Sequence, residues 1–536
     1  MNMNDQKKEI THSAPKTASV KKTLTIATAI MVGSVFLSRV MGLIREQVIA
    51  IHGGTSFEID AYVTAFLIPE ILNHFLAGGF LSVTFIPIYQ KYMLAKDNRG
   101  ASRCFSNLMT TGSLLFCIMI PLTIYYTPEL LGFMGANISI PERREITIRL
   151  TRIILPAQIL FYWGAFLSAV QMANQRFFYP ALAPLIYNLG IIAGGIFLGP
   201  KLGVEGFAWG VLGGALIGNF IIQIPGTIRA GIKYKPRFDL TDPDLVKYVK
   251  LTVPLVLGLG LTFSNEVFFR FFGSFLGEGG TASLNYALRT MMMVVAVFGQ
   301  ASGVAFFPFI SRLAVEKEFE KMTSLLNSVL TQLILYIIPI TGIMIVLSPQ
   351  IISLLFQHGN FSARSTAATA PILSVYLLGA FGFSAVMIIA RSFYAMQNTM
   401  LPMIVSTFTA VLSLPLYWFF SKVLGASGIA WAAVISMTAQ FLILYSIWFR
   451  KYREHKSTKA LIRVFMKALA ITLAGTVCCW AIKIMIGPMM AGSGAMIVNL
   501  LTITAAGLPS LLLIFYAYEI MGLQNFKNSL KTLLRR

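Results

Sequence analysis

The chain has 536 residues, of which 56% are hydrophobic and only 12% are charged, and its formal net charge is +22. A soluble domain carries roughly 25% charged residues, so this composition excludes an ordinary soluble fold. Uncharged apolar stretches recur near the length of about 20 residues that a helix needs to cross a bilayer, and they show no alternation of period 2. We therefore predict an all-α polytopic membrane protein.

Turn residues and charge clusters divide the apolar sequence into fourteen predicted transmembrane helices. The expected spans, in chain order, are 24–49, 58–88, 105–127, 149–173, 179–199, 204–228, 248–276, 282–310, 325–347, 369–396, 401–422, 426–449, 464–486 and 496–521.

The distribution of basic residues predicts the orientation of these spans. Residues 1–23 are polar and contain lysines, and we expect them to form a cytosolic tail before an uncleaved first span. With this start, 30 of the 43 Lys and Arg residues fall on the cytosolic side and 8 on the outer side. This bias predicts a multi-pass protein of the cytoplasmic (inner) membrane with both termini cytosolic. Topology and anionic lipid thus explain the basic charge, and we expect no nucleic-acid partner.

Three proline-containing segments of the first half recur in the second half at nearly one offset. They pair Pro87 with Pro308, Pro128 with Pro349, and Pro180 with Pro402, at offsets of 221, 221 and 222 positions. The duplication predicts a six-helix N-lobe at 24–228, a cytosolic linker at 229–247 and a six-helix C-lobe at 248–449. Residues 450–536 then hold two extra C-terminal helices and a cytosolic tail. Parallel repeats of this kind place the substrate path between the lobes.

The first predicted span contains two arginines. Arg39 and Arg45 are six residues apart, or about 120° around an ideal helix, and Gly42 between them allows a bend that turns both toward one cavity. Two guanidinium groups in one cavity repel each other unless an anion joins them, and arginine binds phosphate in bidentate fashion. We therefore predict that Arg39 and Arg45 bind substrate, and we assign Glu46 to ion pairing.

Other predicted spans also carry ionisable residues. Asp60 lies near the outer end of the second span, and we expect it to act structurally or as a gate by pairing with a first-span arginine. Glu70 and His74 are four residues apart on one helix face, as are Glu266 and Arg270 in the seventh span. A local ion pair is one interpretation of this last spacing, and a functional role is the other.

Arg289 in the eighth span has no acidic residue close to it in the sequence. A charged residue inside a membrane span is costly, and it usually faces a water-filled cavity, pairs with another charge or binds substrate. The absence of a nearby acid favours substrate binding by Arg289, with a structural ion pair as the alternative.

Several of these residues belong to a recognisable pattern. Its segments are Ser38-Arg39-Val40-x-Gly42-x-x-Arg45-Glu46, Asp60-Ala61-Tyr62-x-x-Ala65-Phe66-x-x-Pro69, Phe85-Ile86-Pro87 and Phe356-Gln357-His358-Gly359-Asn360-Phe361. Over about residues 24–450 the chain resembles the MurJ/MviN lipid II flippases, and the two extra C-terminal helices also fit. The resemblance implies the fourteen-helix fold of the multidrug/oligosaccharidyl-lipid/polysaccharide exporter superfamily. It also implies alternating-access flipping of lipid II, the undecaprenyl-diphosphate-linked disaccharide-peptide precursor of peptidoglycan, from the inner to the outer leaflet.

The resemblance also implies roles for individual residues. It maps the cavity arginines of the family onto Arg39, Arg45 and Arg289, and the gating aspartate onto Asp60. The two extra helices would form a groove for the lipid tail. Lipid II and membrane lipid are the implied partners, and cell-wall synthesis proteins are candidates.

The second span departs from the family pattern. The family usually carries an arginine where this chain has Asn73, which is followed by His74. We assign both residues to gating or ion pairing, although a neutral histidine would not replace the missing charge.

Two related transport functions remain as alternatives: flipping of another lipid-linked oligosaccharide, or multidrug/cation antiport. An antiporter for cations should line its cavity with acids and aromatic residues, whereas the charges inside these spans are mainly cationic. The sequence contains neither a G-x-x-x-x-G-K-[ST] phosphate loop nor an H-E-x-x-H motif. We therefore expect a transporter rather than an enzyme, with no catalytic residue, metal site or cofactor.

The charge distribution generates a test of topology. Tags placed after Arg536 or in the 451–460 loop should be cytosolic, and a cysteine at Gly425 should react with an impermeant thiol reagent from outside. Labelling of intact cells measures both. A C-terminus that is accessible from outside would contradict the fourteen-span arrangement.

Overall fold

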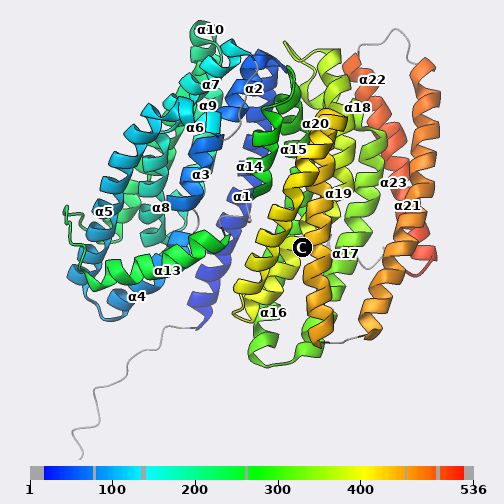
Figure 1. The fold of residues 1–536 in the computed structure, drawn as a ribbon. Coiled ribbons are helices and arrows are strands. Elements are labelled where there is room, and N and C mark those ends of the chain that lie inside the picture. Colours follow the sequence, from blue (N-terminus) through cyan, green and yellow to red (C-terminus); the bar gives the residue numbers. More distant parts are fainter. Residues whose placement is uncertain are drawn as a thin grey trace, which may run out of the picture.

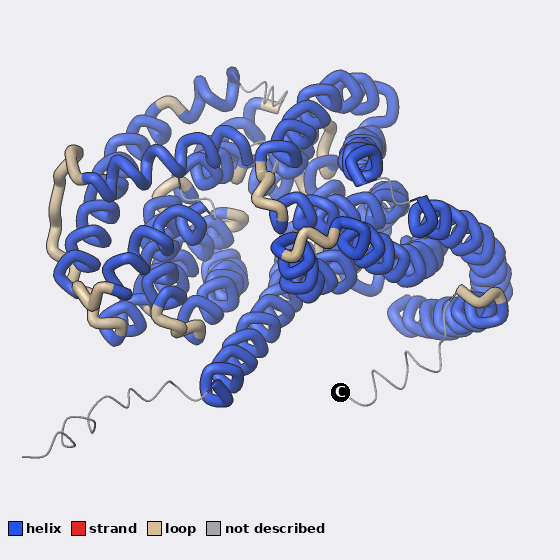
Figure 2. The backbone as a smooth tube through the Cα atoms, turned by 90° about the horizontal axis from the view of Figure 1, so that it is seen from below, coloured by secondary structure: helices blue, strands red, loops and turns tan. Residues whose placement is uncertain are grey.

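The computed structural model describes residues 17–76, 80–133, 140–259, 264–452, 455–489 and 495–523. These residues form helices joined by turns and short loops, and they contain no strand. Figure 2 shows this from one end of the molecule, with the helices seen close to their axes. The all-α fold class predicted from the sequence is therefore confirmed. Most of the two predicted tails lies outside the described residues.

The helices of the first half lie together on one side of α1 (Figure 1). Their bounds are α1 Thr17–Gly53, α2 Phe57–Ala65, α3 Leu67–Leu76, α4 Phe80–Leu94, α5 Asn98–Tyr125, α6 Thr127–Phe133, α7 Pro141–Ile154, α8 Ala157–Ala173, α9 Phe178–Ala193, η1 Gly194–Leu198, α10 Gly199–Leu202, α11 Glu205–Gly214, η2 Ala215–Ile221 and α12 Gln223–Arg229.

Most helices of the second half lie on the other side of α1, with α21 and α23 at its margin (Figure 1). The bounds are α13 Pro243–Leu259, α14 Ser264–Gly273, α15 Gly280–Val294, η4 Val295–Gln300, α16 Ala301–Val315, α17 Phe319–Val346, α18 Ser348–Phe356, α19 Ala363–Ala395, α20 Met400–Tyr452, α21 His455–Met489, α22 Ala495–Thr502, η5 Ile503–Gly507 and α23 Leu508–Ile520.

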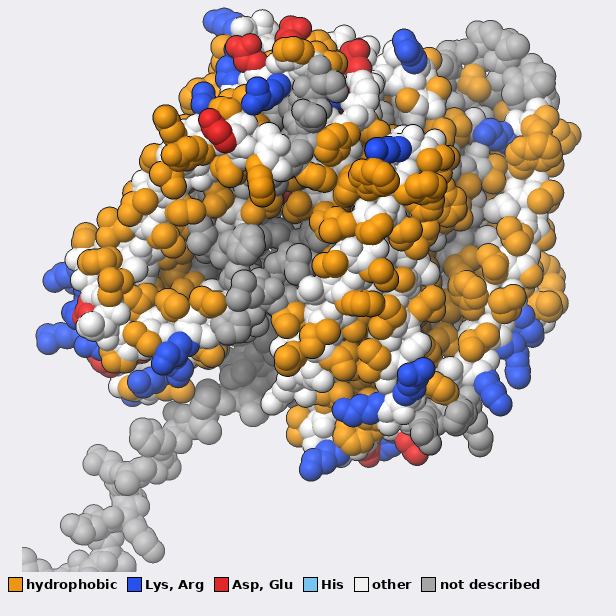
Figure 3. Space-filling view, in the orientation of Figure 1, with side chains coloured by type: hydrophobic (Ala, Val, Ile, Leu, Met, Phe, Trp, Pro, Cys, Tyr) orange, Lys and Arg blue, Asp and Glu red, His pale blue; other side chains and the backbone are white. Residues whose placement is uncertain are grey.

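Ten helices within the described residues are long and apolar enough to cross a membrane. One of them, α20, contains two helices, because Gly425 has a φ of 58° that reverses the chain direction. Figure 3 shows hydrophobic side chains over most of the flank of the molecule and Lys and Arg side chains toward its two ends. The total of fourteen spans stays a prediction, because the second and seventh predicted spans are each divided into shorter helices.

The glycine at position 425 also refines the labelling experiment. A cysteine there would be strained, because L residues rarely adopt a positive φ. Lys422 and Val423, in the same turn region, are exposed and leave the glycine intact when replaced. Cysteines at these two positions therefore test the same topology without disturbing the turn.

The second predicted span breaks at Phe66, between α2 and α3. Pro69 has no backbone N–H, so it cannot bond to the carbonyl of Ala65 in the preceding turn. The Thr151 hydroxyl on α7 donates to that carbonyl instead, at 3.2 Å. This break separates Asp60 on α2 from Glu70 on α3, and so allows the two carboxylates to meet different partners.

The predicted cytosolic linker is an ordered strap rather than a free loop. Between α12 and α13 the chain is extended, and the backbone N–H groups of Lys233 and Lys235 donate to Ser102 and Ser106 of α5 at 3.3 and 3.0 Å. The next alternate residue, Arg237, donates its N–H to Thr110 at 3.3 Å. Hydroxyls spaced by four on one helix thus satisfy every second N–H of an extended segment.

Glycines allow α9 and α11 to approach each other closely. A Cβ atom added at Gly210 would lie 2.6 Å from the carbonyl oxygen of Gly190, and one added at Gly190 would lie 2.4 Å from the Cα atom of Gly214. Small residues at such contacts let helices pack through their backbones inside a membrane.

This close contact generates a stability prediction. Gly210→Ala should lower the stability of the folded protein by roughly 1–3 kcal/mol, because backbone atoms cannot move aside easily. Gly213→Ala is the matched control, since a Cβ atom at Gly213 meets nothing within 4 Å. Thermal unfolding in detergent measures the difference, and equal melting temperatures for the two variants would contradict the glycine contact.

Candidate functional site

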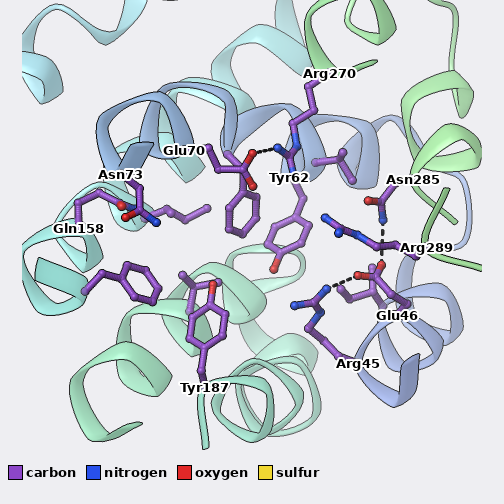
Figure 4. Close-up of a pocket in the computed structure, with 16 residues that line it drawn as sticks. Arg45, Glu46, Tyr62, Glu70, Asn73, Gln158, Tyr187, Arg270, Asn285 and Arg289 are labelled. Carbon is purple, nitrogen blue, oxygen red and sulfur yellow. Dashed lines mark hydrogen bonds and ion pairs between the residues drawn. The ribbon is translucent and has the colours of Figure 1, made fainter. Parts of the chain in front are cut away.

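A polar cavity of about 300 Å³ lies where the two halves meet. Side chains from α1, α2, α3, α7, α8, α9, α11, α14 and α15 line it. Its charged residues are Arg45, Glu46, Glu70, Arg270 and Arg289. Figure 4 shows their charged groups turned inward around Tyr62. An interior with three guanidinium groups is unusual, since such charges are rare within membrane spans.

Glu46 connects the two halves at one side of the cavity. It is 3% exposed, pairs through Oε1 with Arg45, and accepts a hydrogen bond through Oε2 from Asn285 of α15 at 2.8 Å. Arg45 also donates to Asn188 of α9 at 3.1 Å. The role of ion pairing that we assigned to Glu46 therefore has a geometric basis in these contacts.

The other two cavity arginines pair with acids in ways that the sequence did not predict. Arg270 pairs with Glu70 of α3 rather than with Glu266, four residues before it. Glu266 instead approaches Arg289, with Oε1 3.6 Å from the guanidinium Nη1 atom. The expectation that Arg289 is unpaired was wrong, because helices α14 and α15 pack against each other and bring the two residues together.

Asp60 lies on α2, before the break in the second span, whereas Glu70 lies after it on α3. The Asp60 side chain is fully buried. Its two oxygens accept hydrogen bonds from the backbone N–H groups of Gly279 and Ala282, both at 2.7 Å. These groups lie at the N-terminus of α15, where unsatisfied N–H groups and the helix dipole favour an anion. Asp60 thereby fixes α2 of the first half to α15 of the second.

The cationic neighbour of Asp60 is Arg143, at 3.8 Å, and not a first-span arginine. The predicted pairing was therefore wrong. Arg143 falls between the third and fourth predicted spans, but α7 begins at Pro141 and buries this side chain to 2% exposure. Arg143 also donates to the carbonyl of Leu276 and to the Thr281 hydroxyl at 3.0 and 3.1 Å.

The remaining predicted site residues occupy different positions. Arg39 is exposed, donates to Gln300 at 3.1 Å and is not among the residues that line the cavity, although the charge of Arg289 acts on it. The expectation that Arg39 and Arg45 both face this cavity is thus met by Arg45 alone. Asn73 lines the cavity near Gln158 (Figure 4). The side chain of His74 lies outside the described residues.

Arg270 is the cavity residue that sequence reasoning undervalued. Its i,i+4 spacing from Glu266 offered a local partner, so no residue pattern pointed to a distant one. The signal that could have found it is Glu70, an acid in the second span with no Lys or Arg on the same helix face. Glu70 and Glu266 pair with Arg270 and Arg289, and the packing of α3, α14 and α15 decides which acid meets which arginine.

Comparison with known proteins assigns the chain to a family. A family model described as lipid II flippase MurJ matches residues 49–500 of the chain. The chain belongs to the lipid II flippase MurJ family. It is therefore a multi-pass membrane protein of a transporter family, as the sequence predicted.

Relatives in the MurJ family match across most of their length. The lipid II flippase MurJ of Burkholderia cenocepacia is 25% identical over 452 residues, which cover 83% of this chain and 87% of that protein. The probable lipid II flippase MurJ of Thermotoga maritima is 27% identical over 429 residues, covering 80% and 85%.

Solved structures support the same MurJ assignment. A lipid II flippase MurJ in an inward closed conformation matches with a TM-score of 0.76 and 25% identity, over 92% of this chain and 99% of that one. An inward-facing multidrug resistance MATE family transporter of the MOP superfamily matches with a TM-score of 0.64 and 15% identity, over 79% and 96%. This second likeness concerns the fold alone, so the MurJ match is the more specific.

The chemistry available in this MurJ family member is anion recognition. Among the described residues, no group of three or more His, Cys, Asp and Glu side chains could hold a metal ion. The guanidinium groups of Arg45, Arg270 and Arg289 instead offer planar sets of N–H donors, which suit phosphate oxygens.

The contacts of Asp60 generate a prediction for this MurJ family member. Asp60→Asn should lower the stability of the folded protein by about 1–3 kcal/mol. The amide offers the N-terminus of α15 one acceptor fewer, and it leaves Arg143 without its anion. Thermal unfolding of the purified protein measures the loss. Combining Asp60→Asn with Arg143→Met should recover part of it if the two side chains act together.

The exposed Arg149–Glu205 pair, with its N–O distance of 2.6 Å, provides the control for Asp60. Arg149→Gln should cost at most about 1 kcal/mol, because water screens a surface pair. Equal losses of stability for Asp60→Asn and Arg149→Gln would show that the buried contact does not stabilise the protein. Strict additivity of Asp60→Asn and Arg143→Met would show the same.

Proposed function

We propose that this protein carries lipid II from the inner to the outer leaflet of the cytoplasmic membrane by alternating access. Membership of the MurJ family supports the transport of a lipid-linked precursor. The observation that carries the proposal is the cavity between the two halves, where three arginines meet. The lining holds three arginines and two glutamates, so it carries a net positive charge that an anionic ligand would offset.

The proposed ligand of the arginines is the diphosphate of lipid II. A diphosphate presents two groups of acceptor oxygens, and arginine forms charge-assisted, bidentate bonds with such groups. Arg45 comes from α1 in the first half and Arg289 from α15 in the second. Binding one ligand from both halves is what alternating access requires of a central site. Arg39, which lies near Arg289, would contact the diphosphate on its way into the cavity.

The size of the cavity implies that the halves must move. A volume of about 300 Å³ is at the lower end of the range for small-molecule sites, and a disaccharide-peptide headgroup needs more room. We infer that the contacts of Glu46 with Asn285 and of Asp60 with the N-terminus of α15 hold the outer side closed. Asp60 then acts as a gate, and its release from α15 opens the path outward.

An apolar groove of about 730 Å³ is the proposed site of the polyprenyl tail. It lies between α17, α19, α20 and α21, and it is lined by side chains such as Ile338, Phe381 and Phe465. Apolar lining suits a hydrocarbon chain, whose burial is favourable in proportion to its area. The first of the two extra C-terminal helices, α21, forms one wall, which supports the predicted use of this region for the lipid tail.

The alternative functions fit the cavity less well. A multidrug or cation antiporter needs a net negative site, whereas the cavity lining holds three arginines and two glutamates. A flippase for another lipid-linked oligosaccharide would also use a diphosphate site, so family membership decides between the two. We place the protein in the inner membrane with cytosolic termini on the charge bias alone, and cell-wall synthesis proteins remain candidate partners.

The test of this proposal is to remove the cavity arginines one at a time. Alanine at Arg45 or Arg289 should weaken binding of lipid II about 10- to 100-fold, because a charge-assisted hydrogen bond contributes roughly 1.5–3 kcal/mol. Lysine should give an intermediate loss, because it keeps the charge and loses the planar fork. Arg39 variants should follow the same order with smaller effects. Binding is measured in nanodiscs, and transport by rescue of growth in cells depleted of their own flippase.

The control for these variants is Arg312→Gln, at an exposed pair with Glu316 far from the cavity. This variant should bind lipid II and restore growth as well as the unmodified protein does. A well-expressed Arg45→Ala or Arg289→Ala variant that binds lipid II normally would refute the diphosphate site. If the arginines serve folding alone, the alanine variants should instead be lost from the membrane.

A further inference from the structure

The ion pair of Arg270 and Glu70 joins the two halves across the cavity. Arg270 lies on α14 in the second half, and Glu70 lies on α3 in the first. Figure 4 shows the pair at one side of the cavity, away from Arg45 and Glu46. The diphosphate site proposed above assigns no role to Glu70, and it does not say how Arg270 becomes available to the ligand.

The environment of Arg270 is poorly suited to a permanent structural arginine. The residue is 3% exposed, and its Nε atom has no hydrogen-bond partner among the described residues. The positive charges of Arg289 and Arg45 act on it. Its guanidinium carbon lies 5.0 Å from the ring centre of Phe269 and 5.9 Å from that of Phe66. Glu70 in contact, the more distant charge of Glu46 and two aromatic faces thus compensate a buried cation that two further cations repel.

The two partners differ in their access to water. The side chain of Glu70 is 23% exposed, whereas that of Arg270 is 4% exposed. A carboxylate that leaves the pair can be hydrated within the cavity, whereas the guanidinium cannot follow it. Displacement of Glu70 would therefore leave the guanidinium group of Arg270 in position to bind an entering anion.

Among the described side chains, the neighbour of Glu70 on the same face of α3 is neutral. Asn73 lies three residues further along α3 and also lines the cavity. It can donate hydrogen bonds, but it brings no charge that would hold Glu70 after the pair opens. Asn73 therefore does not oppose the exchange of Arg270 for water or for a polar group of the ligand.

We propose that Glu70 is an internal anion that occupies Arg270 while the cavity is empty, and that the diphosphate of the substrate takes its place. Arg270 then joins Arg45 and Arg289 as a further binding residue, contributed by α14. This inference rests on the proposed function. The exchange also releases α3 from α14, so ligand binding removes one contact between the halves at the moment when they must separate.

The test compares three variants of the full-length protein in nanodiscs, with undecaprenyl diphosphate as the probe and undecaprenol as its neutral counterpart. Glu70→Gln should bind undecaprenyl diphosphate about tenfold more tightly or better, because the ligand no longer competes with a carboxylate. Arg270→Gln should bind it about tenfold more weakly. The double variant should behave like Arg270→Gln, since Glu70 acts only through Arg270. Binding of undecaprenol should not change.

A second measurement separates binding from stability. Glu70→Gln leaves Arg270 without an anion, so undecaprenyl diphosphate should raise its melting temperature more than that of the unmodified protein. Glu205→Gln, which removes the acid of the Arg149 pair outside the cavity, should show the unmodified shift. If Arg270→Gln does not fold, Arg270→Lys replaces it and should bind with intermediate affinity.

The outcomes distinguish this inference from the proposed function. Unchanged or weaker binding by Glu70→Gln, together with weaker binding by Arg45→Ala, would overturn the exchange and leave the diphosphate site standing. Equal binding of undecaprenyl diphosphate and undecaprenol by the unmodified protein would overturn the proposed function itself. A purely structural pair predicts that both single variants lose stability, that the double variant regains it, and that the probe binds all three alike.

Discussion

An arginine within an apolar helical bundle costs about 2.5–3.5 kcal/mol on insertion scales, and that cost must be offset by an anion. In this protein the offsetting carboxylates are supplied across the fold. Glu70 of α3 pairs with Arg270 of α14, and Asp60 of α2 caps α15 beside Arg143 of α7. The contacts of Arg270 with Glu70 and of Asp60 with α15 therefore require the two halves to come together, whereas Arg45 and Arg289 meet carboxylates of their own half.

The backbone is arranged to present these charges. Pro69 breaks the second span, and the Thr151 hydroxyl satisfies the carbonyl that the break leaves free. The break gives Asp60 and Glu70 separate surroundings, one sealed against the N-terminus of α15 and one open to the cavity. Within the first half, the glycines of α9 and α11 bring the helices close without any charge. The backbone contacts at these glycines thus lie within a half, whereas the Glu70–Arg270 pair and the Asp60 cap lie between the halves.

This division suits a protein that must open and close. Apolar contacts through small residues are rigid, because backbone atoms meet directly. An ion pair or a helix cap can be exchanged for water or for a charged ligand at little net cost, since each charge keeps a partner. The contacts of Glu70 with Arg270 and of Asp60 with α15 can therefore open when an anionic ligand binds, while each half keeps its own structure.

The sequence by itself determined that the chain is an all-α membrane protein, that its apolar segments are helices, and that Arg45, Glu46 and Arg289 lie at a site of interest. Helix formation in apolar segments is local, because every backbone hydrogen bond is made within the segment. Only the tertiary structure decided which charges pair. Glu266 lies four residues from Arg270 yet approaches Arg289, and Asp60 meets Arg143 rather than Arg39 or Arg45. Periodicity places a side chain on a helix face, but its partner depends on how helices far apart in the sequence pack, and one sequence does not record that.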